Sequence, residues 1–355
     1  MKFKLLVLGI IISLYYYNAN AQNTPLYVGT YTDGYSEGIY KLDFNQNTGE
    51  LSNLQLAVST QNPSFITYSR NKKFIYAVSE SLGGSVSSFK IRENGHLKFL
   101  NKVSSNGKGP CHISINRQGN KAVVSNYSGG SASIYSIARN GKLNDATQIF
   151  NYNTDDKVSH AHSAQFFRNE LYIADLGINA LYQYKLKDNT YKLTLPTVVE
   201  MVENPGPRHF TITKNGQYIY IINEYGSSVT SIKRTETGFK QIDYDSTLDE
   251  TYKGNNSCAD IHLSRNELYL YGSNRGENSI VVFKRNKLDG TIEKIQTVPV
   301  HGDWPRNFTL DPSGKFLLVA NKKSHNISVF RINTSTGKLS FLNDVKVPRP
   351  VCLLF

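Results

Sequence analysis

The sequence is poor in cysteine, and the few cysteines present exclude a disulfide-stabilised framework. Only three occur among its 355 residues. Cys111, Cys258 and Cys352 are odd in number and widely spaced, so we expect them to be small apolar residues of the core. Cys111 could be a catalytic thiol, but the sequence assigns no base to it.

Long runs of basic residues are also absent, although the net charge is +12. Lysines and arginines are scattered through expected loops and strand edges, and nowhere form a run of five or six. A nucleic-acid-binding surface usually concentrates its positive charge in a patch or stripe. We therefore expect a solvated basic surface and no nucleic-acid partner.

Apolar stretches long enough to cross a membrane are missing as well. The apolar run Leu5–Tyr17 is too short to span a bilayer comfortably. It follows Met1-Lys-Phe-Lys and precedes Ala19-Asn-Ala21, which is the charged start, apolar middle and small-residue cleavage site of a secretory signal peptide. We expect residues 1–21 to be removed and the protein to be exported, to the periplasm or the medium, with no membrane attachment left.

Several catalytic motifs do not occur. The sequence has no Gly-x-Ser-x-Gly turn, no Walker motif and no dinucleotide-binding glycine motif. No segment shows a convincing helical period either. These absences argue against an α/β hydrolase, an NTPase and a dehydrogenase.

What the sequence does contain is a repeat of about 48 residues, present in six copies and a split seventh. Each copy alternates strand-like runs with tight turns, such as the Asn215-Gly216 hairpin. Aligning the copies gives one equivalent position, at intervals of 47, 51, 46, 51, 47 and 45 residues: Ser64, Cys111, His162, Arg208, Ala259, Arg306 and Val351. We predict an all-β, seven-bladed β-propeller with four-stranded antiparallel blades, forming one domain over residues 22–355.

The two ends of the chain are predicted to share the seventh blade. Leu26–Leu54 has the pattern of the last three strands of a blade, and Arg349–Phe355 has that of a first strand. Joining them closes the ring without a free sheet edge.

In a propeller the first strand of each blade is innermost, so equivalent positions of all blades surround one axis. The residue after the aligned position is Phe65, His112, Ser163, His209, Asp260 or Asn307. A second set of residues expected near the axis lies in the loop after the second strand. In five copies it is 16 residues beyond the aligned position, which gives Glu80, Tyr127, Glu224, Arg275 and Lys322. In the third blade the matching residue is Leu176, at a shorter spacing.

These sets contain titratable and charged residues where a pure scaffold would have apolar ones. Three arginines against one or two carboxylates suit a bound carboxylate or phosphate. His162 can move a proton near neutral pH. Glu224 can either orient that imidazole or pair with an arginine. The pattern fits hydrolysis of an ester or lactone that carries a negative group. A water-filled channel with mutually neutralising salt bridges is the alternative.

A metal site is a weaker interpretation. His160-Ala-His162 would place two imidazoles on one side of a strand. No third ligand is evident in the sequence, so we predict that no metal is bound.

At these residues the chain resembles the seven-bladed propeller lactonases, a family that includes bacterial propeller-type 6-phosphogluconolactonases and fungal carboxymuconate lactonising enzymes. The resemblance runs from about Leu26 to Phe355. The segments that carry it are Gly109-Pro-Cys-His-Ile-Ser, His162-Ser-Ala, Gly206-Pro-Arg-His-Phe, Asn223-Glu224, Ala259-Asp-Ile-His262, Asn274-Arg275, Pro305-Arg-Asn-Phe308 and Lys323-Ser-His-Asn-Ile-Ser-Val-Phe330.

This resemblance implies an active site in the central channel that uses no metal or organic cofactor. The family's catalytic residues would be His162, Arg208, Glu224 and Arg275. The implied reaction is hydrolysis of 6-phosphogluconolactone to 6-phosphogluconate. An exported member would meet few phosphorylated sugars, so an aldonolactone or a carboxylated lactone is an alternative substrate.

Three functions follow, of which the leading one is a cofactor-free lactonase acting as a monomer on a small anionic lactone. In it Arg208 and Arg275 bind the anionic group and the carbonyl oxygen, while His162 activates water with help from Glu224. The residues expected to bind the substrate and shape its pocket are His112, His209, Asp260 and Arg306. The alternatives are a muconate-type lactonising cycloisomerase and a non-catalytic exported propeller that binds an anionic sugar or partner.

Overall fold

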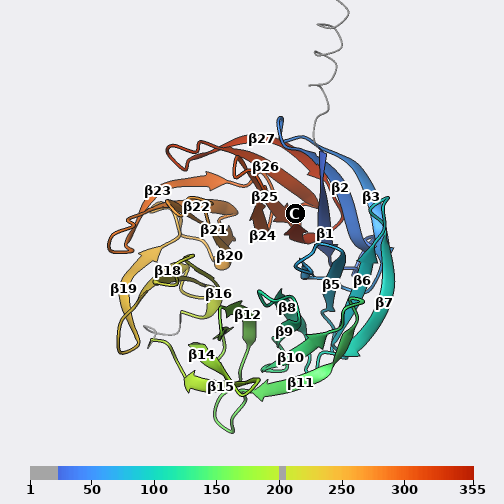
Figure 1. The fold of residues 1–355 in the computed structure, drawn as a ribbon. Helices are drawn as coiled ribbons and strands as arrows, with labels where there is room; N and C mark the ends of the chain where they lie inside the picture. Colours follow the sequence, from blue (N-terminus) through green and yellow to red (C-terminus); the bar gives the residue numbers. More distant parts are fainter. Residues whose placement is uncertain (1–22, 200–204) are drawn as a thin grey trace, which may run out of the picture.

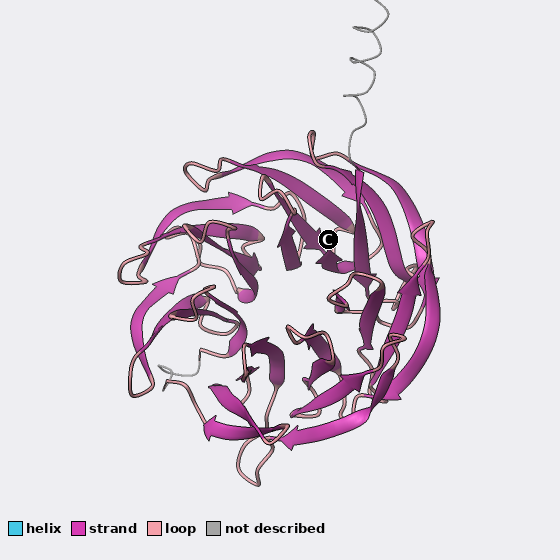
Figure 2. Ribbon diagram, in the orientation of Figure 1, coloured by secondary structure: helices cyan, strands magenta, loops and turns pink. Residues whose placement is uncertain are grey.

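The computed structural model describes residues 23–199 and 205–355. In this part of the chain the strands form seven four-stranded antiparallel sheets, and no helix is present (Figure 2). It follows that these residues contain no helix able to cross a membrane. The sheets stand around a common centre, with one strand of each sheet innermost (Figure 1). The predicted seven-bladed all-β propeller is confirmed, whereas the predicted signal peptide at residues 1–21 lies outside the described residues.

We number the blades along the chain, and the blade shared by the two ends is the seventh. Blade 1 consists of β4 (Ile66–Tyr68), β5 (Phe74–Ser79), β6 (Ser85–Ile91) and β7 (Leu97–Ser104). Blade 2 consists of β8 (Pro110–Ile115), β9 (Lys121–Asn126), β10 (Ser131–Ile137) and β11 (Leu143–Asn151). Blade 3 consists of β12 (Ala161–Phe167), β13 (Glu170–Asp175), β14 (Ala180–Lys187) and β15 (Thr190–Leu195). Blade 4 consists of β16 (Pro207–Ile212), β17 (Tyr218–Asn223), β18 (Ser228–Arg234) and β19 (Phe239–Ser246). Blade 5 consists of β20 (Ser257–Leu263), β21 (Tyr269–Arg275), β22 (Ser279–Arg285) and β23 (Ile292–Pro299). Blade 6 consists of β24 (Pro305–Leu310), β25 (Phe316–Asn321), β26 (Asn326–Ile332) and β27 (Leu339–Lys346).

Blade 7 is built from both ends of the chain, as predicted. Its strands are β28 (Pro350–Leu354), β1 (Asn23–Thr30), β2 (Gly38–Asn45) and β3 (Leu51–Ser59). The inner strand β28 pairs antiparallel with β1, which aligns Leu353 with Val28. β28 also contacts the inner strands of blades 6 and 1, β24 and β4, so the ring is closed.

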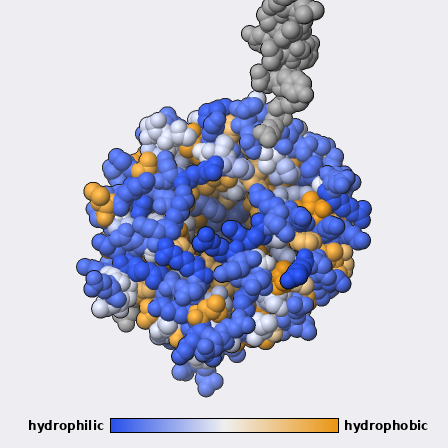
Figure 3. Space-filling model, in the orientation of Figure 1, coloured by the Kyte–Doolittle hydropathy of each residue, from blue (hydrophilic) through white to orange (hydrophobic). Residues whose placement is uncertain are grey.

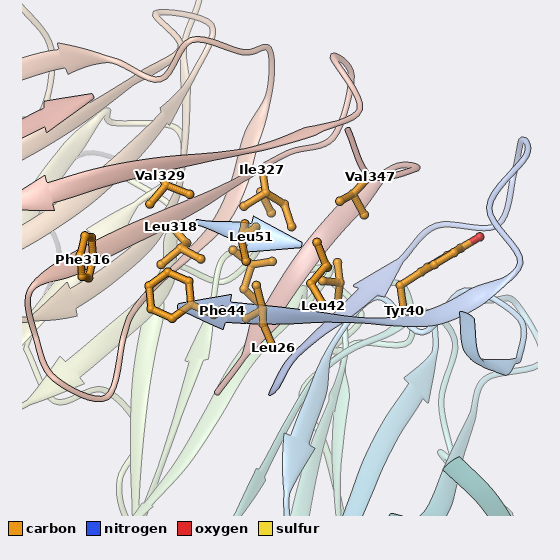
Figure 4. Packing of buried hydrophobic residues seen from close by; sticks show 13 residues of the cluster. Leu26, Tyr40, Leu42, Phe44, Leu51, Phe316, Leu318, Ile327, Val329 and Val347 are labelled. Carbon is orange, nitrogen blue, oxygen red and sulfur yellow. The ribbon is translucent and has the colours of Figure 1, made fainter. Parts of the chain in front are cut away.

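Apolar residues hold neighbouring blades together. The described residues form seven apolar clusters, one at each interface between adjacent blades. Figure 4 shows the cluster between blades 6 and 7, where Phe44 and Leu26 face Phe316 and Leu318. Because both faces of a blade are covered, β25 is buried along its whole length instead of alternating. Burying each such large side chain contributes roughly 1.5–3 kcal/mol.

The inner strands carry a β-bulge at the position that the repeat alignment selected. In six blades the pairing register between the first and second strands skips a residue at this point. The skipped residues are Cys111, His162, Arg208, Ala259 with Asp260, Arg306 and Val351. Successive side chains of a regular strand point to opposite faces, but a bulge re-aims a side chain. Two consecutive residues of one blade can therefore both reach the axis.

A left-handed backbone turn leads into five of the inner strands. Each turn is followed by a proline, which lacks an N–H for the sheet and so fits the start of a strand. The residues with positive φ before these prolines are Asn62 (41°), Gly109 (60°), Gly206 (70°), Trp304 (67°) and Arg349 (42°). Glycine and asparagine adopt this conformation most easily. The tryptophan and the arginine are the exceptions.

Candidate active site

The two predicted sets of inner residues lie at the same end of the ring. In five blades the residue after the second strand donates its backbone N–H to the carbonyl of the residue two positions before the inner residue. The pairs are Glu80 to Asn62 (3.0 Å), Tyr127 to Gly109 (2.9 Å), Leu176 to His160 (3.1 Å), Glu224 to Gly206 (2.7 Å) and Lys322 to Trp304 (3.1 Å). The expected match of Leu176 in blade 3 is thereby confirmed. On the face seen in Figure 3 the middle of the ring is hollowed and surrounded by hydrophilic residues.

Glu224 joins two arginines from neighbouring blades. Its Oε2 lies 2.8 Å from Arg208 Nε and 2.8 Å from Arg275 Nη2. Its Oε1 accepts a hydrogen bond from Ser257 Oγ at 3.1 Å. Of the two partners considered for Glu224, the structure therefore shows arginine and not His162.

The charges in this group are strongly coupled. Burial alone would raise the pKa of Glu224, but Arg275 and Arg208 outweigh it and lower that pKa. Burial, followed by the charge of Arg208, lowers the pKa of Arg275 to about 10. The carboxylate is therefore ionised at neutral pH, and both guanidinium groups remain charged.

The two guanidinium groups differ in their hydrogen-bond partners. Arg208 is 1% exposed, and its Nη1 donates to the carbonyl of Ala259. Arg275 donates from Nε to Ser257 O and from Nη2 to Cys258 O, at 3.0 and 2.8 Å. Among the described residues, none forms a hydrogen bond with Arg275 Nη1. This nitrogen can therefore donate to a bound molecule.

A second charged group, formed by blades 6, 7 and 1, faces the first. Arg306 Nη2 lies 3.4 Å from Glu80 Oε2, which also accepts a hydrogen bond from Tyr31 Oη at 2.7 Å. Lys322 Nζ lies 4.4 Å from the centre of the Tyr31 ring. The Arg306 side chain is 16% exposed, against 2% for Arg208 and 4% for Arg275, so it is the most accessible of the three guanidinium groups.

His162 occupies the bulge of blade 3 and is 4% exposed. Its ring lies edge-on to those of Tyr127 and His209, with centroids 5.6 and 5.1 Å apart. Its Nδ1 is buried and has no hydrogen-bond partner among the described residues. Burial and the nearby charge of Arg208 hold the pKa of His162 well below its usual range. The imidazole is therefore neutral at pH 7 and able to accept a proton.

Asp260 is a buried carboxylate that fixes two histidines. Its Oδ1 lies 2.8 Å from His209 Nδ1, and its Oδ2 lies 3.1 Å from His262 Nε2. Oδ2 also accepts a hydrogen bond from Asn307 Nδ2 at 2.5 Å. Burial opposes ionisation, but His262 and His209 hold the pKa of Asp260 well below its usual range. With 3% exposure and both oxygens engaged, Asp260 is placed to orient His209, and its contact with the substrate stays a prediction.

Three rings from different blades contact one another. Phe65, His112 and His209 come from blades 1, 2 and 4, and their centroids lie 4.4 Å (Phe65–His112), 5.5 Å (His112–His209) and 6.1 Å (Phe65–His209) apart. Burial and the charge of Arg208 lower the pKa of His209 to about 4, although Asp260 acts in the opposite direction.

Replacing Asp260 by asparagine is expected to lower the free energy of unfolding by about 1–3 kcal/mol, because His209, His262 and Asn307 lose a buried charged acceptor. Urea denaturation measures the effect. Asp33→Asn is the matched control, since Asp33 pairs with an arginine at the surface and its side chain is 59% exposed; its effect should stay below about 0.5 kcal/mol. A raised KM with unchanged stability in Asp260→Asn would instead indicate direct substrate contact.

The thiol and metal interpretations gain no geometric support. Cys111 is buried, its Sγ lies 3.2 Å from the carbonyl of His162, and burial raises its pKa to about 12. This agrees with the expected core role. His160 precedes β12 and is not part of the strand, and its ring stacks on Tyr127 at 4.4 Å. Residues 23–199 and 205–355 contain no group of three or more His, Cys, Asp or Glu side chains placed to hold a metal ion.

Sequence reasoning missed Tyr31 and Trp304. Tyr31 follows the second strand of blade 7 and donates its N–H to Arg349 O at 3.3 Å, two positions before Val351. It is thus the blade 7 counterpart of Glu80, hidden because this repeat is split between the chain ends. Aligning Tyr27–Tyr31 with Tyr76–Glu80 of blade 1 would have found it. Trp304 precedes an inner position instead of occupying one.

Comparison with known proteins identifies the family. The family described as "Lactonase, 7-bladed beta-propeller" matches residues 25–355. The chain belongs to the propeller lactonase family. A Formosa agariphila protein named 6-phosphogluconolactonase is 36% identical over 338 residues, covering 89% of this chain and 95% of that protein. A Bacillus subtilis protein of the same name is 32% identical, covering 93% and 97%.

A solved structure supports the same assignment. The periplasmic gluconolactonase PpgL of Pseudomonas aeruginosa is 25% identical, with a TM-score of 0.84, covering 94% of this chain and 98% of that one. Membership of the propeller lactonases makes the protein a carboxylic-ester hydrolase that acts on a small lactone. The individual roles of the site residues remain predictions.

Proposed function

We propose that this lactonase hydrolyses a sugar-type lactone, similar to 6-phosphogluconolactone, to the open-chain acid in a cationic central channel and without a cofactor. The observation that carries the proposal is an excess of positive charge beside one neutral imidazole, His162. The cations are Arg208, Arg275, Arg306 and Lys322, and the carboxylates are Glu80, Glu224 and Asp260, so four against three leaves +1. Such a surplus suits a substrate with a carboxylate or phosphate, or the oxyanion that forms during hydrolysis.

In this proposal Arg275 Nη1 donates to the lactone carbonyl oxygen and stabilises the oxyanion as it develops. His162 takes a proton from water while the water oxygen attacks the carbonyl carbon. The ring C–O bond then breaks, and His162 returns its proton to the departing oxygen, which becomes a hydroxyl. Arg306, the most accessible guanidinium, binds the anionic group of the substrate. Glu224 holds Arg208 and Arg275 in place.

The compartment bears on the substrate. The sequence of residues 1–21 is that of a secretory signal peptide, so we propose that the protein is exported. Phosphorylated sugars are scarce outside the cytoplasm, and the periplasmic relative from Pseudomonas aeruginosa is a gluconolactonase. We therefore propose an unphosphorylated aldonolactone as the physiological substrate.

The test is a panel of lactones assayed by proton release with the purified protein. Glucono-δ-lactone and 6-phosphogluconolactone are compared side by side, and the spontaneous hydrolysis of each is subtracted. We expect saturable turnover of at least one sugar lactone. Turnover of neither, together with tight binding of gluconate in calorimetry, would favour a non-catalytic propeller. Ring closure of carboxymuconate, followed by ultraviolet absorbance, would favour the cycloisomerase.

Removal of metal ions is expected to leave turnover unchanged. The proposed chemistry needs only protein side chains, so dialysis against a chelator should preserve kcat for the best lactone. Assay of the dialysed protein with and without added Mg²⁺, Ca²⁺ or Zn²⁺ measures this. Loss of activity that one of these ions restores would overturn the cofactor-free mechanism.

A further inference from the structure

Trp304 lies beside the arginine assigned to the carbonyl oxygen. The Arg275 guanidinium carbon is 5.3 Å from the centre of the Trp304 ring, and Lys323 Nζ is 3.6 Å from it. Both distances are within the range of a cation–π contact, and tryptophan is the best aromatic partner for it. The indole, which is half-buried, therefore links Arg275 of blade 5 to a lysine of blade 6.

The backbone at Trp304 is unfavourable for a tryptophan. Its φ is 67°, in the left-handed region that suits glycine. At the same point of the repeat, before the proline of the inner strand, two other blades have Gly109 and Gly206, and a third has Asn62. A bulky residue in such a conformation persists only where its surroundings hold it, and such residues cluster at functional sites.

Neighbouring residues hold this conformation in place. Trp304 N–H donates to Asn278 Oδ1 at 2.9 Å, and Trp304 O accepts from Lys322 N–H at 3.1 Å. The preceding Asp303 accepts from Asn278 Nδ2 through Oδ1 at 3.0 Å, and its carbonyl accepts from Lys323 N–H at 3.1 Å. Blades 5 and 6 thus fix the backbone of Trp304 at their junction.

We propose that Trp304 is a positioning residue that acts through Arg275. Nε and Nη2 of Arg275 are held by Ser257, Cys258 and Glu224, so the direction of Nη1 depends on the orientation of the guanidinium plane. The indole contacts this group and directs Nη1 toward the substrate. This inference rests on the proposed function, in which Arg275 stabilises the oxyanion.

The decisive comparison is Trp304→Gly with Trp304→Phe. Glycine removes the aromatic contact but relieves the left-handed backbone, so we expect kcat to fall about 10-fold while KM changes less than about two-fold and the thermal unfolding midpoint does not fall. Phenylalanine keeps an aromatic face and should recover most of kcat. Wild-type kcat in Trp304→Gly would overturn the proposal. Equal losses of stability and kcat in both variants would assign a purely structural role and also overturn it.

Arg349→Gly is the matched control. Arg349 has the same pre-proline position in blade 7, with a φ of 42°, and it pairs with Asp33 at the surface. We expect this variant to keep wild-type kcat and KM. An equal fall in kcat would show that the glycine itself, and not the loss of the indole, impairs the site.

A fluorescence measurement separates this inference from the proposed function. Trp304 is the only tryptophan in the chain, so tryptophan emission reports on this position alone. We expect Arg275→Met to shift its emission maximum, and gluconate to shift it in the wild type, with neither result depending on turnover. If no lactone is hydrolysed but both shifts occur, the proposed function fails and the contact between Trp304 and Arg275 stands. If lactones are hydrolysed and Arg275→Met leaves the emission unchanged, the positioning contact is refuted.

Discussion

Replacing His162 by alanine should lower kcat for the best lactone on the order of 10²–10⁴-fold, the usual contribution of a positioned acid–base group. The loss follows from removing the imidazole that accepts the proton of the attacking water. Initial rates of proton release, corrected for spontaneous hydrolysis, measure it. His160→Ala is the matched control. Like His162, His160 contacts the ring of Tyr127, but it stacks on that ring and does not join the charged groups. Its kcat should stay near the wild-type value.

The pH dependence of the wild type provides an independent check on His162. A base works only when neutral, and burial together with Arg208 lowers the pKa of His162 well below 6.5. Activity should therefore persist as the pH falls through 6.5 and decline only at a lower pH. The pH profile of kcat/KM reports this pKa in the free enzyme. An acid limb at or above pH 6.5, or a His162→Ala variant with wild-type rates, would exclude this histidine as the base.

Replacing Glu224 by glutamine should cost about 3–5 kcal/mol of unfolding free energy, because breaking a buried ion pair leaves charges without compensation. Arg208 and Arg275 both lie 2.8 Å from one carboxylate oxygen, and the glutamine of the variant carries no negative charge to offset them. Catalysis should fall as well, since the two guanidinium groups then repel each other and lose their alignment. Urea denaturation and lactone assays of the same preparation measure the two effects.

The stability difference between wild type and Glu224→Gln should depend on pH in one direction. The folded-state pKa of Glu224 is lowered below its ordinary value of 4.5, so the ionised carboxylate stabilises the protein fully above that value. The difference should be constant from neutral pH to about 4.5 and shrink as the pH falls further, because the unfolded chain then takes up the proton first. A difference that grows on acidification would contradict the ion-pair account.

Glu80→Gln is the control for this pair. Glu80 approaches Arg306 only to 3.4 Å, and its side chain is 23% exposed. The loss of stability should therefore be smaller, at most about 1 kcal/mol. Equal losses in both variants would mean that the shared carboxylate of Glu224 has no special role.

The architecture was predictable because it follows from a repeat. Seven copies of one strand pattern dictate seven equivalent sheets. The seventh copy has its first strand at the C-terminal end of the chain and its other three strands at the N-terminal end, which dictates how the ring closes. The inner position was predictable for the same reason, since equivalent residues of a ring converge on its axis. Tyr31 escaped notice because its copy is interrupted by the chain ends.

The partners of the charged residues were not predictable from spacing. The sequence left open whether Glu224 serves His162 or an arginine, and only the distances show that it joins Arg208 and Arg275. Asp260 is the counterpart of His112 and His209 in the repeat, yet both of its oxygens are engaged within the protein. Side-chain reach and the rotation between neighbouring blades decide such pairings.

The sequence by itself therefore determined the number of blades, the closure of the ring and the equivalent inner position of each blade, because all three depend on periodicity alone. The tertiary structure decided how those residues are used. The bulges that turn Arg208 and His209 toward the same axis depend on a hydrogen-bond register between strands. The contact between Trp304 and Arg275 depends on two blades meeting. Neither is encoded in the period of the repeat, since both arise only when separate strands pack together.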